Sequence, residues 1–113
     1  MRYWLDTEFI ELPGTLDLIS IGIVAEDGRE LYAENAYVNW ALASDWVHKN
    51  VRPHLRGGGM ALADIRDNVL RFVGDDKPEF WGYYADYDWV VFCWLFGAMI
   101  DLPRTFMLKS RKT

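Results

Sequence analysis

Apolar residues in the first third of the chain follow the patterns of β-strands. Residues 2–9 open with aromatic and apolar side chains and predict one strand. Residues 17–25 form a nearly continuous β-branched run, which is typical of a buried strand. An Asp27-Gly28 pair follows, and after it residues 30–38 predict a third strand. Because Asp-Gly tolerates positive φ, the second and third segments predict a hairpin.

The middle of the chain carries helical patterns. Ser44 is a favourable N-cap for a short helix that runs towards Val51 and that Pro53 is expected to end, and the glycines at residues 57–59 predict a loop. Apolar residues recur at helical spacing over residues 61–73, and Gly74 is the expected C′ residue of that helix.

The last third of the chain predicts a strand at residues 79–84 and a helix that begins at Asp86 and ends near Gly97. Residues 104–113 are polar and basic and predict no clear element. The order is three strands, two helices, a strand and a helix. This order predicts an α/β fold in which helices flank a mixed sheet.

Composition limits the possible classes of protein. The 113 residues fit one domain, and a hydrophobic fraction of 51% suffices for a core. A net charge of −5 means that a nucleic-acid partner needs a local basic patch or a metal site. The single Cys93 excludes an internal disulfide or a cysteine-based zinc site. Asp6 and Glu8 interrupt any signal peptide, and residues 89–100 are too short to span a bilayer, so we expect a soluble, cytoplasmic protein without a membrane partner.

Asp6 and Glu8 are the first candidates for chemistry. On a strand, residues two apart point to the same face, so the two carboxylates lie side by side at the end of an apolar strand. At that spacing they repel each other, and a divalent cation would relieve the repulsion. The alternative is a strand end that simply enters solvent, and the spacing alone does not separate the two interpretations.

A second group of candidates lies where the last strand meets the last helix. Asp86 is well placed as an N-cap, and Asp88 then falls in the first helical turn. The helix dipole favours carboxylates there, which is a purely structural explanation for both residues. The functional interpretation is that Asp88 completes a metal site with Asp6 and Glu8. Tyr87 belongs to an aromatic cluster around this junction.

Together these motifs resemble the DEDD (DnaQ-like) 3′–5′ exonucleases, and most closely their compact exoribonucleases. The resemblance rests on Asp6-Thr7-Glu8, on the Ser20-Ile21-Gly22 strand with its hairpin, and on Tyr87-Asp88 at a helix start. It implies an RNase H-like fold with a five-strand type of sheet.

The resemblance also implies a function and a site. The expected activity is 3′–5′ hydrolysis of single-stranded RNA or DNA with two Mg²⁺ or Mn²⁺ ions about 3.5–4 Å apart. Asp6 would bridge both ions, Glu8 would hold one ion and position the terminal nucleotide, and Asp88 would act on the second ion. Phe9 and Tyr87 are the candidates for substrate binding, with Phe9 favoured because residues leaving that strand line the cleft. A homodimer is plausible by the same resemblance.

One part of the family pattern is missing. The family requires a histidine shortly before a fourth carboxylate on a final helix. This chain has only His48 and His54, which are interpreted as surface residues of a basic stretch, and Asp101 is the only acid after Asp88. We therefore expect an exonuclease domain that lacks its final helix, through truncation or a frameshift. The alternative is a nuclease-like domain that binds nucleic acid or protein without cutting.

Overall fold

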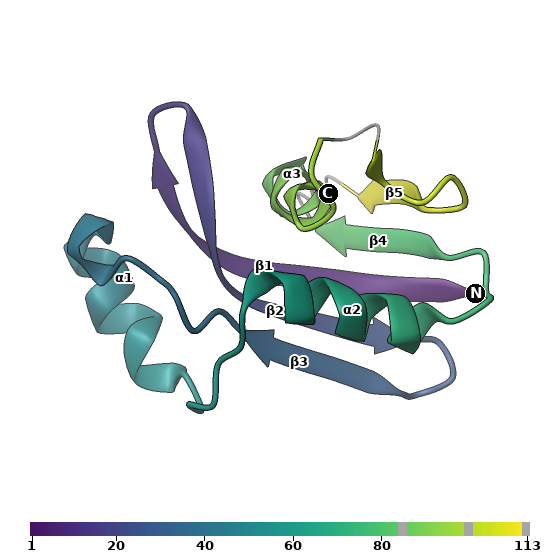
Figure 1. The fold of residues 1–113 in the computed structure, drawn as a ribbon, viewed down its shortest axis with the longest axis horizontal. Helices are drawn as coiled ribbons and strands as arrows, with labels where there is room; N and C mark the ends of the chain where they lie inside the picture. Colours follow the sequence, from purple (N-terminus) through teal and green to yellow (C-terminus); the bar gives the residue numbers. More distant parts are fainter. Residues whose placement is uncertain (84–85, 99–100, 112–113) are drawn as a thin grey trace.

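The structure, a computed structural model, describes residues 1–83, 86–98 and 101–111, without the side chains of Tyr83, Asp86 and residues 107–111. Within these residues, five strands form one mixed sheet in the order β3-β2-β1-β4-β5 (Figure 1). The strands are β1 (Arg2–Leu12), β2 (Thr15–Ala25), β3 (Glu30–Glu34), β4 (Glu79–Tyr83) and β5 (Met107–Arg111). The helices are η1 (Trp40–Leu42), α1 (Asp45–Asn50), η2 (Arg52–His54), α2 (Leu62–Val73) and α3 (Asp86–Trp94).

The connections between strands give the sheet its mixed character. The β1–β2 and β2–β3 pairs are antiparallel, whereas β1–β4 and β4–β5 are parallel. Each parallel pair needs a crossover, and α2 and α3 supply these connections. This arrangement is consistent with an RNase H-like α/β fold. No α-helix follows α3 in the described part of the chain.

Strand β1 divides its side chains between two faces of the sheet. Tyr3, Leu5 and Thr7 are buried on one face of the sheet. Trp4, Asp6 and Glu8 alternate with them and are exposed on the other face. The buried face meets both long helices, because Ile65 and Val69 of α2 share one core with Val91, Phe92 and Leu95 of α3.

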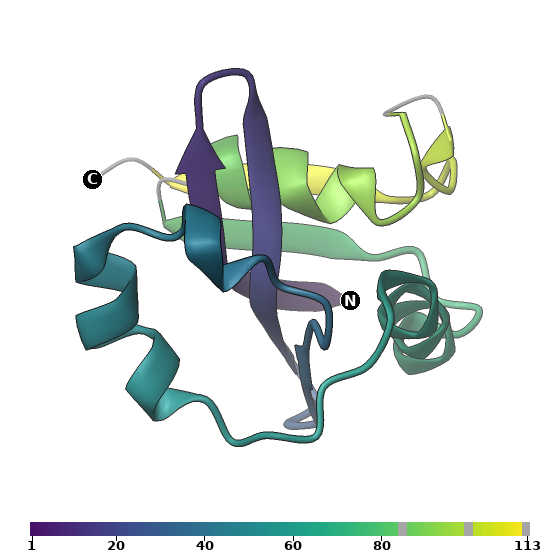
Figure 2. The ribbon, with the colours of Figure 1, turned by 60° about the vertical axis from the view of Figure 1, so that its left-hand side comes forward.

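Helix α1 covers a different part of the sheet. Its residues Val47 and Val51 pack with Ile10 of β1 and Ile19 of β2. By the alternation of β1, Ile10 lies on the same face as Glu8. Figure 2 shows α1 well separated from α2, with the β1–β2 ribbon between them. The face that carries Asp6 and Glu8 is therefore bordered by α1 at one end.

Several predicted elements are confirmed with altered bounds. The first two strands and the helix over residues 61–73 are present, and Gly74 follows that helix with φ 61°. Ser44 caps α1 by accepting a hydrogen bond from the Val47 amide at 3.2 Å. Cys93 is a buried free thiol.

The ends of the third strand and of the last helix were predicted wrongly. The third strand ends at Glu34 rather than residue 38, because the Asn35 side chain bonds both to the Leu18 carbonyl and to the Tyr37 amide and turns the chain. Helix α1 ends at Asn50 with Val51 as its C-cap, as predicted for a helix running towards Val51, and Pro53 lies just beyond it, inside η2. Helix α3 ends at Trp94.

The largest error concerns the C-terminal segment. Residues 104–113 were expected to have no clear element, but they contain β5, which pairs in parallel with β4 from Met107 to Arg111. The exposed edge of β4 supplies the hydrogen-bond partners for the backbone of β5, and the polar sequence of β5 gives no local sign of that edge.

In the described parts of the chain, no helix is long and apolar enough to cross a lipid bilayer.

Candidate functional site

The two acids of β1 lie beside an open edge of the strand. β4 pairs with β1 only from Arg2 to Trp4. Strand β1 continues to Leu12 through its antiparallel ladder with β2. Asp6 and Glu8 thus lie in the middle of β1, and the prediction that they stand at a strand end was wrong. The pairing with β4, by contrast, ends at Trp4. Among the described residues, no strand pairs with β1 on that side next to Asp6 and Glu8, so side chains can occupy the space there.

Helix α3 brings Asp88 to this open edge. Asp88 is the third residue of α3, as predicted for the first turn. Its Oδ1 accepts a hydrogen bond from the Thr7 hydroxyl, and both side chains are buried. Because Thr7 lies between Asp6 and Glu8, this bond places the Asp88 carboxylate beside the acidic pair. The N-cap role predicted for Asp86 depends on a side chain outside the described set.

The pKa values of two of these carboxyls are raised. Burial is the largest cause of the raised pKa of Glu8, followed by the charges of Asp6 and Asp88. Burial also raises the pKa of Asp88, and the charge of Asp6 adds to that effect, while the Thr7 hydrogen bond opposes both. The three carboxylates therefore repel one another at short range, and the Thr7 hydroxyl offsets part of that cost for Asp88 alone.

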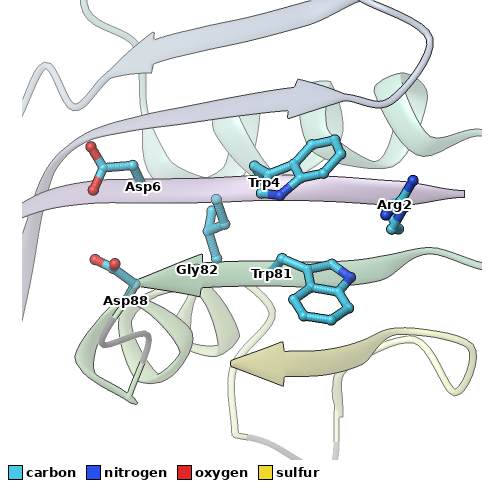
Figure 3. A pocket seen from close by; sticks show the side chains of 7 residues that line it. Arg2, Trp4, Asp6, Trp81, Gly82 and Asp88 are labelled. Carbon is cyan, nitrogen blue, oxygen red and sulfur yellow. The ribbon is translucent and has the colours of Figure 1, made fainter. Parts of the chain in front are cut away.

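The three carboxylates lie close together, but they do not point to one common position at which they could hold a metal ion. Figure 3 shows the Asp6 and Asp88 side chains next to each other at one end of a cavity, on β1 and at the start of α3. Across the described residues, no three His, Cys, Asp or Glu side chains are placed so that they could hold a metal ion. The chemistry of the donors nevertheless suits a hard divalent cation, because carboxylate oxygens are the ligands preferred by Mg²⁺ and Mn²⁺.

Asp6 lies between two cavities. The first has a volume of about 490 Å³ and is lined by Arg2, Trp4, Trp81 and Asp88 as well as Asp6 (Figure 3). The second has a volume of about 390 Å³ and lies on the other side of Asp6. Its lining includes Glu8, Gly22, Tyr32, Trp46, Asn50 and His54.

The second cavity contains residues that the sequence did not single out. Tyr32 comes from β3, Trp46 from α1 and His54 from η2, and all three meet Glu8 only in the folded chain. His54 is exposed, as expected, but it also lines this cavity. His48 is half-buried, and its Nε2 lies 2.9 Å from the Trp40 carbonyl oxygen.

The residues proposed for substrate binding and for the missing motif lie elsewhere. Phe9 is half-buried, packs against the main core and meets Tyr87 edge to face with ring centroids 6.0 Å apart. Tyr87 is 52% exposed and lines a third cavity, between α3 and the β1–β2 turn. Asp101 accepts a hydrogen bond from the Ala98 amide at 2.9 Å, which closes a local turn. Neither Phe9 nor Asp101 lines the two cavities that Asp6 borders.

Comparison with known proteins shows to which family the chain belongs. No protein-family profile matches it. A 3′–5′ exoribonuclease of Mycobacterium tuberculosis is 43% identical over 112 residues, a match that covers 93% of this chain and 67% of the relative. Proteins named RNA pyrophosphohydrolase from Brucella abortus and Brucella ovis are each 32% identical over 96 residues, covering 74% of this chain and 52% of the relatives. The chain belongs to the family of the mycobacterial 3′–5′ exoribonuclease.

Proposed function

We propose that this chain is a divalent-metal-dependent 3′–5′ exonuclease of the DEDD type that acts on single-stranded RNA. The observation that carries the proposal is the group of three carboxylates at the open edge of β1, where burial and mutual repulsion raise the pKa of Glu8 and of Asp88. The Thr7 hydroxyl offsets part of the cost for Asp88 alone, whereas a bound cation would offset the repulsion among all three carboxylates. The names of the mycobacterial and Brucella relatives both refer to RNA, which supports RNA over DNA.

The carboxylates have distinct roles in this proposal. Asp6 borders both cavities and would bridge two Mg²⁺ or Mn²⁺ ions. Glu8 lines only the second cavity and Asp88 only the first, so each would hold an ion from its own side. Thr7 engages Oδ1 of Asp88, which leaves Oδ2 for a ligand. Bound ions would lower the pKa of the attacking water and stabilise the leaving 3′ oxygen.

Binding of the cation is the first test of this function. Mn²⁺ at millimolar concentration should raise the melting temperature, because a ligand that binds only the folded state stabilises it by mass action. Asp6→Asn should remove the shift. Asp64→Asn is the matched control, since it makes the same change in charge on α2, which packs against the opposite face of the sheet. A shift of equal size in Asp6→Asn and the wild type would refute the site.

Cleavage is the second test. A 5′-labelled single-stranded RNA should shorten from its 3′ end in the presence of Mn²⁺, and Asp6→Ala should not shorten it. The Asp6→Ala preparation also measures any contaminating nuclease. Identical slow decay in the two samples, together with retained RNA binding, would favour a nuclease-like binding domain over an enzyme.

A further inference from the structure

The second cavity has a glycine at its floor. Gly22 of β2 pairs with Asp6 of β1 on one side and with Tyr32 of β3 on the other. A Cβ atom added at Gly22 would meet nothing within 4 Å, so open space lies between the carboxylate and the tyrosine ring. Two strand spacings separate Asp6 from Tyr32, or roughly 10 Å. A group bound near Asp6 can therefore extend across Gly22 toward Tyr32.

A buried carboxylate fixes the loop beside that tyrosine. Glu34 is buried and accepts hydrogen bonds from the Arg56 amide at 2.6 Å and the Gly57 amide at 3.1 Å. It also accepts a hydrogen bond from the Tyr32 hydroxyl. Burial opposes ionisation of Glu34, but these hydrogen bonds, with a smaller contribution from the charge of Arg56, outweigh it and lower the pKa of the carboxyl. Burial, followed by the hydrogen bond to Glu34 and the charge of that carboxylate, raises the pKa of Tyr32 to about 12, so its hydroxyl remains a donor.

This arrangement holds Arg56 against Tyr32, which lines the cavity. Its guanidinium carbon lies 4.1 Å from the centroid of the Tyr32 ring, and its side chain is exposed. Arg2, Arg29 and Arg66 each pair with a carboxylate. Arg56 pairs with none among the described residues, and its guanidinium donates no hydrogen bond to them. The guanidinium of Arg56 can therefore donate its N–H groups to a ligand while it stacks on the Tyr32 ring.

We propose that Arg56 binds a phosphate group of the nucleic acid in this cavity, and that Glu34 is the positioning residue that holds it there. The proposal rests on the proposed nuclease function. Asp6 and Glu8 repel phosphates, and the chain as a whole is acidic, with a net charge of −5. A guanidinium held against Tyr32, across Gly22 from Asp6, supplies a local attraction that the overall charge does not, and its planar fork matches two phosphate oxygens.

The salt dependence of RNA binding tests this contact. Binding of a fluorescent single-stranded RNA, protected at its 3′ end by phosphorothioate linkages, would be measured by anisotropy with Mn²⁺ present across a range of salt concentrations. Arg56→Gln should weaken binding about tenfold at low salt. It should also reduce the slope of log K against log salt by about 0.7, the value for one phosphate contact on a single strand.

A second arginine provides the control. Arg52 is also exposed, and its guanidinium lies 4.6 Å from the centroid of the Trp40 ring, so Arg52→Gln removes the same charge from a similar platform. It should change the slope by less than half as much. Glu34→Gln, which retains Arg56, should lower the slope as Arg56→Gln does, and the double variant should add little further, because the two residues act together.

The outcomes separate this proposal from the nuclease function. Equal affinities and slopes for Arg56→Gln and Arg52→Gln would overturn the role of Arg56, even if Mn²⁺ still stabilises the chain through Asp6. A slope change specific to Arg56→Gln without any Mn²⁺ effect would uphold the phosphate contact and refute the metal-dependent function. A normal slope in a folded Glu34→Gln variant would overturn the positioning role of Glu34.

Discussion

The hydroxyl of Thr7 donates a hydrogen bond to Oδ1 of Asp88 and thereby joins the middle of β1 to the first turn of α3. The two residues are 81 positions apart in the chain, and both are buried. This bond is the direct link between the acidic pair of β1 and the third carboxylate of the proposed site.

Loss of the Thr7 hydroxyl should destabilise the chain. Thr7→Val keeps the shape of the side chain but leaves a buried carboxylate without its donor, which costs about 1–3 kcal/mol. Thr7→Ser retains the hydroxyl and should stay closer to the wild type. Urea denaturation of the three proteins at neutral pH measures the difference. An unchanged midpoint in Thr7→Val would show that the bond contributes nothing to stability.

Two glutamates should respond to pH in opposite ways. The folded-state pKa of Glu8 is raised above its usual value of 4.5, so Glu8 destabilises the metal-free fold above that pKa and the penalty disappears on acidification. Glu8→Gln should therefore raise the melting temperature at pH 7, and the gain should vanish as the pH falls toward 4.5.

Glu34 should behave in the reverse manner. Its folded-state pKa is lowered from 4.5, so its contribution is present above pH 4.5 and is lost as the pH falls through the lowered value. Glu34→Gln should cost about 1–3 kcal/mol at pH 7, because the backbone amides of the loop lose a charged acceptor. Melting curves from pH 3 to pH 7 test both variants, and the same sign of change for the two at pH 7 would contradict the assignments.

Gly22 allows function to be separated from folding. Gly22→Ala should leave the melting temperature equal or higher, because alanine has less backbone freedom to lose and its Cβ meets open space. It should nevertheless slow cleavage and weaken RNA binding by filling the floor of the second cavity. Gly59→Ala is the contrast, since its Cβ would lie 2.8 Å from the Ala36 nitrogen and should destabilise the fold. Full RNA binding by Gly22→Ala would show that the substrate does not cross this floor.

The choice of metal should affect the rate. Mn²⁺ should support cleavage by the 113 residues better than Mg²⁺, because Mg²⁺ demands stricter octahedral geometry and the three carboxylates do not converge on one point. Cleavage should be slow with either ion, since a positioned general base contributes about 10²–10⁴-fold and histidine occurs only at His48 and His54. Initial rates at matched concentrations of the two ions provide the measurement. Rapid cleavage with Mg²⁺ would mean that another group acts as the base.

Much of the fold could be predicted because its signals are local. The β-branched run of β2, the spacing of Ile65, Val69 and Val73, and the Ser44 cap each act within a few residues. Strand β5 depended on β4, a partner distant in the sequence, and the length of β1 depended on its hairpin with β2, in which Leu12 pairs with Thr15. The edge of β4 determines β5, and the pairing with β2 determines the length of β1. Neither feature can be read from the sequence of the strand itself.

The candidate site likewise includes features that the sequence predicted and features that only the folded structure created. The sequence alone determined that Asp6 and Glu8 share a face, because side chains of a strand alternate with a period of two, and it placed Asp88 in the first turn of a helix. Only the tertiary structure decided that Thr7 reaches Asp88, that Tyr32 and His54 line the space beside Glu8, and that Arg56 packs on Tyr32. These residues come from separate elements whose side chains meet only after the sheet has formed and α1, η2 and α3 have docked on it.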